Sequence, residues 1–195
     1  MRKLLITLAL GLAGSLTLAA DAVPPHPYIE IVTTEGKIIL ELDGRQAPIT
    51  VAHFLKLVDS GFYNGTIFHR IIPGFMAQAG GHTPDLKLKE SEEMIANESG
   101  NGLSNLRGTV AMARTSDPHS ANSQFFINVA DNDRLDPSKG PTNGTWGYTV
   151  FGRVIEGMQV VDKIVAVRTG PQGPFRSDVP VVPIVIKTMS RYTFE

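Results

Sequence analysis

The stretch Phe68-His69-Arg70-Ile71-Ile72-Pro73-Gly74-Phe75-Met76-Ala77-Gln78-Ala79-Gly80-Gly81 places a guanidinium and a side-chain amide among aromatic and aliphatic residues. Residues 68–72 are typical of a β-strand, and Pro73-Gly74 is typical of a turn. Residues 75–79 predict a second short strand, which ends at a pair of glycines. The sequence therefore predicts two adjacent strands with polar groups inside an apolar surface, a mixture that suggests a site.

Strand geometry predicts which of these side chains lie together. Because alternate residues share a face, Phe68, Arg70 and Ile72 are expected to point the same way, as are Met76 and Gln78. A single arginine on such a face ordinarily lays its stem over apolar surface and keeps its charge in water. A functional role needs support from elsewhere in the chain.

That support comes from residues 108–114 (Gly-Thr-Val-Ala-Met-Ala-Arg) and 122–128 (Asn-Ser-Gln-Phe-Phe-Ile-Asn). Together with the first stretch they resemble the cyclophilin family of peptidyl-prolyl cis-trans isomerases. The family pattern "FHR-I-PGFM-Q-G" matches 68–80, "G-AMA" matches 108–113 and "SQFFI" matches 123–127. The resemblance runs from Tyr28 to the C-terminus and is greatest to the bacterial secreted, periplasmic members.

The first 22 residues are predicted to be a secretory signal peptide. Arg2 and Lys3 precede an uncharged apolar run, residues 4–20, and Ala20-Asp21-Ala22 offers small residues at the positions that a signal peptidase reads. The alternative is an uncleaved membrane anchor, but the run is short for a spanning helix and glycines interrupt it. The chain has no cysteine, which excludes disulfides and a lipoprotein anchor.

Removal of residues 1–22 from the 195-residue chain leaves 173, enough for one domain with a substantial core. The chain has 18 basic and 19 acidic residues, and the removed segment holds Arg2, Lys3 and Asp21, so the mature balance is 16 against 18. Nothing resembles the clustered Lys and Arg that a phosphate backbone selects. We expect a monomer with no nucleic-acid partner and no stable membrane association.

Residues 23–27 are expected to form an extended leader, because prolines restrict their own and the preceding backbone, and the domain is expected to span 28–195. Helices are predicted from Ala47-Pro48 to Gly61 and over 158–167. His53 lies off the apolar stripe of the first helix and is expected to be exposed. The polar segment 82–105 predicts a long loop with one helical turn. Strands are predicted at 28–34, 37–42, 68–72, 75–79, 109–112, 124–128, 149–154 and 183–189.

Many short strands with only two clear helices predict a mainly β fold, a closed antiparallel barrel, because closure removes exposed strand edges. The cyclophilin resemblance implies eight strands with a helix at each end, in agreement with this prediction.

Other chemistries lack a motif. The five histidines show no metal-ligand spacing, and no nucleophile elbow, dinucleotide fingerprint or phosphate-binding loop occurs, so we expect no metal and no cofactor. His69 follows the opposite alternation from Arg70 and is expected to be a packed or hydrogen-bonded support residue.

The resemblance implies rotation about the peptide bond before proline. That bond resists rotation by about 18–20 kcal/mol, and the twisted amide regains a nitrogen lone pair that a donor can stabilise. The resemblance assigns Arg70 and Gln78 catalytic roles; a guanidinium is always charged and acts as a fixed donor. The positions that match the family's substrate-binding residues are Phe75, Met76, Ala113, Gln124, Phe126, Leu135 and Tyr148.

Three positions differ from the best-known eukaryotic pattern. Arg134 stands where those relatives carry a tryptophan that contacts the cyclic peptide cyclosporin, Tyr148 replaces a histidine, and Arg114 replaces an asparagine. We therefore expect cyclosporin to bind weakly.

The sequence favours a secreted or periplasmic isomerase that assists folding of exported proteins by acting on proline-containing segments. An alternative is a proline-binding scaffold without useful catalysis, which needs the apolar pocket but not Arg70. Another places the chain in a eukaryotic secretory pathway, where 64–66, 97–99 and 143–145 are glycan acceptor sequences.

Export generates a direct prediction. The mature protein is expected to begin at or near Val23, because cleavage is predicted after Ala22. N-terminal sequencing of protein recovered from a periplasmic or culture fraction measures this, and recovery of an intact Met1 in the membrane pellet would instead support the anchor.

Overall fold

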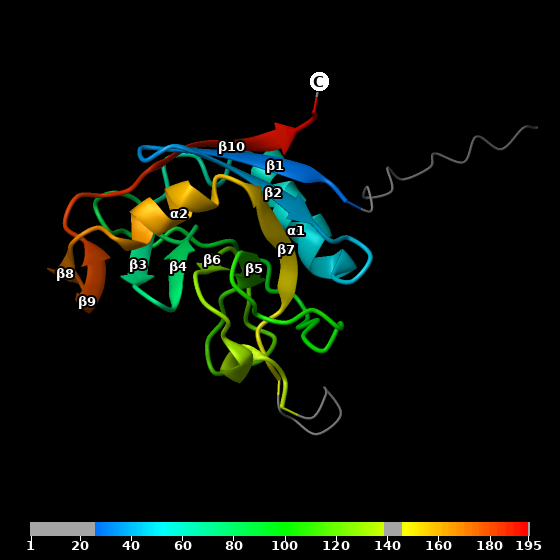
Figure 1. The fold of residues 1–195 in the computed structure, drawn as a ribbon. Coiled ribbons are helices and arrows are strands. Elements are labelled where there is room, and N and C mark those ends of the chain that lie inside the picture. The colour runs from blue at the N-terminus through cyan, green and yellow to red at the C-terminus, as the bar shows by residue number, and fades with distance from the viewer. Residues whose placement is uncertain (1–25, 139–145, 195) are drawn as a thin grey trace, which may run out of the picture.

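The computed structural model describes residues 26–138 and 146–194, and an eight-stranded sheet organises them (Figure 1). Every ladder in this sheet is antiparallel, and the strand order is β10-β1-β2-β7-β5-β6-β4-β3. The strands are β1 (Tyr28–Thr33), β2 (Lys37–Leu42), β3 (Phe68–Ile72), β4 (Met76–Ala79), β5 (Thr109–Met112), β6 (Phe125–Asn128), β7 (Val150–Glu156) and β10 (Ile186–Tyr192). The mainly β prediction is confirmed.

The predicted closure of the barrel is not confirmed, because no ladder joins the outer strands β10 and β3 and the sheet is open. The edge of β3 forms backbone hydrogen bonds with the chain that leads into β10. Ile67 forms an isolated bridge with Val185, and the amide of Phe68 donates to the carbonyl of Ile184 at 3.0 Å. This short contact covers the edge of β3 without continuing the sheet.

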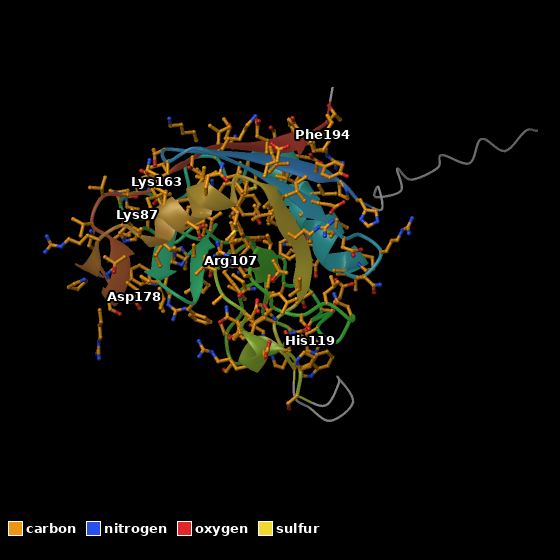
Figure 2. All side chains as sticks on the ribbon, in the orientation of Figure 1. Lys87, Arg107, His119, Lys163, Asp178 and Phe194 are labelled. Carbon is orange, nitrogen blue, oxygen red and sulfur yellow. The ribbon has the colours of Figure 1, made fainter. Side chains whose placement is uncertain are left out.

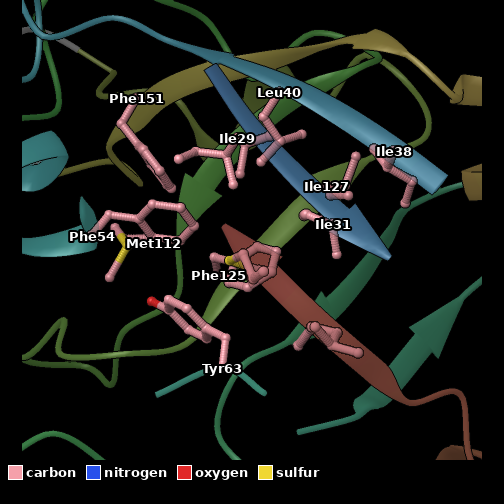
Figure 3. Close-up of a cluster of buried hydrophobic side chains, with 14 of the residues drawn as sticks. Ile29, Ile31, Ile38, Leu40, Phe54, Tyr63, Met112, Phe125, Ile127 and Phe151 are labelled. Atoms are coloured by element: carbon pink, nitrogen blue, oxygen red, sulfur yellow. The ribbon is translucent and has the colours of Figure 1, made fainter. Parts of the chain in front are cut away.

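Two α-helices, α1 (Pro48–Asp59) and α2 (Met158–Val165), accompany the sheet, as expected. Neither is long and apolar enough to cross a membrane, and the same holds for every helix in the described ranges. Both helices bury apolar residues in one core with the sheet. Figure 3 shows its aromatic centre, where the ring of Phe54 lies 5.1 Å from Tyr63, 5.6 Å from Phe125 and 5.0 Å from Phe151.

The long segment 82–105 holds the start of α1. Pro48 suits the first helical turn, where its missing N–H costs nothing, but Ala47 before it has no capping side chain. The carboxylate of Glu98 replaces the cap and accepts from the amides of Ile49 at 3.0 Å and Thr50 at 2.8 Å. An anion at a helix N-terminus also interacts favourably with the helix dipole.

The prediction that His53 is exposed is wrong, because only 4% of its surface is exposed. Its Nε2 contacts the carbonyl of Asn122, and its Nδ1 lies 3.8 Å from the carboxylate of Glu93. The apolar stripe on α1 predicted that one face of the helix is buried. The segments that carry Glu93 and Asn122 cover a second face, which includes His53. The predicted helical turn within 82–105 is also absent from the structure.

Three further elements were not predicted from the sequence. They are the 3-10 helix η1 (Asp133–Leu135) and a separate hairpin of β8 (Thr169–Gln172) and β9 (Phe175–Pro180), seen at the edge beyond β3 in Figure 1. The last strand, β10, begins three residues after the predicted start at 183. Arg107, labelled in Figure 2, pairs with Asp162 of α2 at 2.8 Å and ties the approach to β5 onto that helix.

A register irregularity in β3 corrects the predicted face of Phe68. Phe68 pairs with Ala79 and Arg70 with Gln78, so β3 carries one more residue than β4 between the two pairs. Such a bulge re-aims the side chains that follow it. Phe68 therefore belongs to the main core. Arg70 and Ile72 lie on the other face, where Arg70 lines a cavity and Ile72 packs against a second apolar cluster.

His69, at this bulge, is a packed support residue as expected. Its ring is 2% exposed and lies 4.4 Å from the ring of His82 and 5.9 Å from Phe175 of β9. The pKa of His69 falls from 6.5 to about 3, mainly because burial penalises the charged form and secondarily because His82 lies beside it. The hairpin β8–β9 thus packs against β3 through neutral imidazoles.

This burial predicts acid-sensitive stability. In the unfolded chain His69 takes up a proton near pH 6.5, whereas in the fold it stays neutral until about pH 3. Unfolding therefore binds a proton in this window, and the free energy of unfolding should fall on acidification by up to about 1.4 kcal/mol per pH unit from this group. Urea unfolding at a series of pH values measures the slope.

The variant His69→Gln removes the titrating group, so its pH slope should be smaller than that of the wild type by about the same amount. The matched control is His26→Gln, because His26 is exposed. Equal slopes in the wild type and His69→Gln would contradict the assignment.

Candidate functional site

Register places the predicted site residues in one row across the sheet. Arg70 of β3 pairs with Gln78 of β4, Gln78 pairs with Phe126 of β6, and Phe126 pairs with Ala111 of β5. Directly opposed residues in neighbouring strands project from the same face. The row therefore runs from a cation through an amide to an aromatic ring, and it ends at a small residue.

A small cavity opens over this row. Its volume is about 100 Å³, well below the roughly 300–1,000 Å³ of pockets for drug-sized ligands. Such a volume suits one small ring. The lining residues are Arg70, Phe75, Met76, Gln78, Ala113, Arg114, Phe126, Leu135 and Tyr148.

The floor and walls of the cavity form an apolar cluster separate from the main core. Alternation in β6 sends Phe125 to the main core and Phe126 to this cluster. Met76, Ala111 and Val150 complete its buried part. Tyr148 packs edge-on against Phe126 with the ring centroids 5.6 Å apart. The cavity thus offers aromatic and aliphatic contact on several sides.

The polar edge is a chain of hydrogen bonds that begins at Arg70. The guanidinium donates from Nη1 to Oε1 of Gln78 at 3.4 Å, and Nε2 of Gln78 donates to Oε1 of Gln124 at 2.9 Å. The amide of Gln124 reaches Glu90 at 3.5 Å. Gln124 lies so close to Gly81 that a Cβ there would come within 2.4 Å of its side chain, so the second glycine of the motif makes room for this chain.

The charge of Arg70 has no carboxylate partner within 4.0 Å among residues 26–138 and 146–194. Its side chain is partly exposed at the cavity edge. An unpaired guanidinium keeps donors available for a ligand, and it cannot lose its proton.

Two other arginines lie at the cavity rim. The guanidinium of Arg114 lies 4.6 Å from the ring centre of Tyr148 and donates to the carbonyls of Gly147 and Trp146. The guanidinium of Arg134 lies 4.6 Å from the ring centre of Phe75. Both cations therefore support aromatic walls by cation–π contact.

The structure brings the predicted residues together. All of them line the small cavity except Gln124, which bonds Gln78 and lines a neighbouring hollow of about 520 Å³. The residues that sequence reasoning missed are Glu90, at the end of the polar chain, and the wall-lining role of Arg114. No local pattern marks Glu90, since the backbone brings it to Gln124 from 34 positions away.

Two larger hollows lie elsewhere on the described part of the chain. Hollows of about 460 Å³ beside Glu41 and Arg153 and of about 590 Å³ beside Lys37 and Met158 contain none of the predicted site residues. No group of three or more potential metal ligands occurs within the described ranges.

Comparison with known proteins agrees with this geometry. Residues 28–191 match the family model described as cyclophilin type peptidyl-prolyl cis-trans isomerase/CLD. The chain is 51% identical over 169 residues to peptidyl-prolyl cis-trans isomerase A of Dickeya dadantii, covering 87% of this chain and 86% of that protein. It is 54% identical over 160 residues to peptidyl-prolyl cis-trans isomerase cyp18 of Streptomyces antibioticus, covering 82% and 95%.

Among solved structures, a cyclophilin type peptidyl-prolyl cis-trans isomerase of Cryptosporidium parvum superposes with a TM-score of 0.70 at 25% identity, covering 87% of this chain and 99% of that one. The family match spans most of the chain, and both relatives are identical to it at about half of the aligned residues. The chain therefore belongs to the cyclophilin-type peptidyl-prolyl cis-trans isomerases.

Proposed function

We propose that this isomerase is exported to the periplasm or the medium, where it acts as a monomer on proline-containing segments of other exported proteins while they fold. The charged start, the apolar run and the small residues at 20–22 support export. Spontaneous rotation before proline takes tens to hundreds of seconds, slow enough to limit folding. A small site that grips only a ring suits many different clients.

In the proposed mechanism Arg70 is the catalytic donor, and the observation that carries this role is its unpaired guanidinium at the cavity edge. In the planar amide the nitrogen lone pair is delocalised, so a donor aimed at it gains little. When the bond twists, the lone pair returns and the charged hydrogen bond strengthens. Stabilisation that arises only in the twisted state raises turnover.

The remaining residues are proposed to hold the substrate while the bond rotates. Phe126, Met76 and Leu135 grip the proline ring by apolar contact. Gln78 orients Arg70, and Gln124 orients Gln78, through the hydrogen bonds described above. The lining residue Ala113 is small enough for a peptide backbone to approach closely.

The alternative is a scaffold that binds proline segments and whose isomerase activity does not contribute to its role. Binding alone needs the apolar walls and does not need an unpaired cation beside the ring. Arg70 therefore distinguishes the two.

The substitution Arg70→Ala is expected to lower turnover roughly ten- to over a hundred-fold, because a hydrogen bond to a charged group contributes about 1.5–3 kcal/mol. Peptide affinity should change much less. NMR exchange spectroscopy on an Xaa-Pro peptide measures turnover, a peptide titration measures affinity, and circular dichroism verifies folding. Arg153→Ala is the matched control, since Arg153 is exposed and pairs with Glu41 away from the cavity.

Phe126→Ala should behave differently, because it removes a wall of the cavity and weakens affinity and turnover together.

Unchanged turnover in a folded Arg70→Ala protein would remove Arg70 from its catalytic role and favour the scaffold.

Cyclosporin is expected to inhibit weakly, because the charged Arg134 stands where eukaryotic relatives offer an aromatic ring. Arg134→Trp should tighten inhibition and leave turnover of a short peptide similar. An inhibition titration on both proteins measures this, and strong inhibition of the wild type would show that position 134 is not decisive.

A further inference from the structure

The rim of the proline cavity is assembled from segments that no strand pairing connects. Phe75 lies in the turn between β3 and β4, Leu135 ends η1, and Tyr148 lies just before β7. All three line the cavity. Their spacing determines whether the cavity fits a ring. The backbone amide of Val129, directly after β6, donates to the carbonyl of Phe75 at 3.0 Å, but no strand pairing joins η1 or Tyr148 to this turn.

A chain of buried asparagines lies behind these segments. The side-chain amide of Asn132 donates to the carbonyl of Phe75 at 2.9 Å and to Oδ1 of Asn128 at 2.7 Å. The amide of Asn128 donates in turn to Oδ1 of Asn105 at 3.1 Å and to Oγ1 of Thr109 at 2.9 Å. The chain thus links the turn that carries Phe75 to β6 and β5.

The far end of the chain reaches the other two segments. The backbone and side-chain amides of Asn105 both donate to Oδ1 of Asp136 at 2.8 Å, and its side chain also approaches the carbonyl of Tyr148 at 3.4 Å. Asp136 directly follows Leu135. The carbonyl of Leu135 accepts from the amide of Tyr148 at 2.9 Å.

These asparagines are buried, with exposed fractions of 0% for Asn128, 1% for Asn105 and 5% for Asn132. Buried amides are unfavourable unless their hydrogen bonds are made, and a satisfied network fixes a single arrangement of the groups that it joins. Asn128 lies in β6 two residues after Phe126 and therefore on the same face of the strand, so the network lies beside the cavity floor.

We infer that Asn132, with Asn128 and Asn105, positions Phe75, Leu135 and Tyr148 and so sets the shape of the proline cavity. The three asparagines are positioning residues and do not line the cavity. This inference rests on the proposed function, because it assumes that proline binds in the cavity. It predicts that loss of the network weakens ring binding more than it slows rotation of a bound peptide.

The test is Asn132→Ala, which leaves the carbonyl of Phe75 without its side-chain donor. KM for an Xaa-Pro peptide should rise roughly two- to tenfold, the range expected for loss of the one neutral hydrogen bond that holds Phe75, while kcat changes by less than about twofold. Val161→Ala is the matched control, because Val161 of α2 is fully buried in the main core. It should lower the melting temperature without changing KM.

A double mutant separates positioning from general loosening. In a Phe75→Ala background the ring that Asn132 positions is absent, so adding Asn132→Ala should raise KM by clearly less than it does in the wild type. Asn132→Ser provides a second variant, since its shorter hydroxyl is not expected to bond both acceptors, and it should raise KM in the same direction.

An unchanged KM in Asn132→Ala or Asn132→Ser, or fully additive effects in the double mutant, would overturn the inference while leaving the isomerase assignment intact. A wild-type protein without isomerase activity would instead overturn the proposed function itself.

Discussion

The bulge in β3 is the constraint on which the site depends. A regular strand would place Phe68 and Arg70 on one face, and either the ring would leave the core or the cation would enter it. The extra residue between the pairs Phe68–Ala79 and Arg70–Gln78 resolves this conflict. Phe68 becomes fully buried, and Arg70 reaches the cavity edge. Burying an unpaired guanidinium is far more costly than one irregular ladder position.

The sheet separates stability from function by using its two faces differently. Phe125 and Ile127 belong to the core that both helices cover, whereas Phe126 between them belongs to the cavity cluster. A variant on the cavity face can therefore change the proposed substrate contacts while most of the buried apolar area stays intact. The hairpin β8–β9 adds a further layer, since Phe175 packs 5.0 Å from His82 beside the strand that carries Arg70.

Local patterns predicted the elements that depend on local physics. β2, β3 and β5 have the predicted bounds, because apolar alternation and flanking turns are local properties. The burial of His53 was not predictable from its helix, because segments about 40 and 70 residues further along the chain cover it. For the same reason Glu98 as a helix cap and Glu90 beside Gln124 had no sequence signal. The resemblance supplied most of the site, but it gave no indication of the asparagines behind it.

The hydrogen bond from Arg70 to the neutral amide of Gln78 is long, and this weak pairing is consistent with the proposed chemistry. A carboxylate in the place of Gln78 would bind the guanidinium in short, charged hydrogen bonds and would offset its field at the proline nitrogen. The neutral amide at 3.4 Å orients the cation while leaving its charge uncompensated. The resulting cost is small, because the side chain is only partly buried and water still solvates it before the substrate arrives. In the proposed mechanism a peptide displaces that water, so that the same charge acts in a drier environment and its interaction with the returning lone pair becomes stronger.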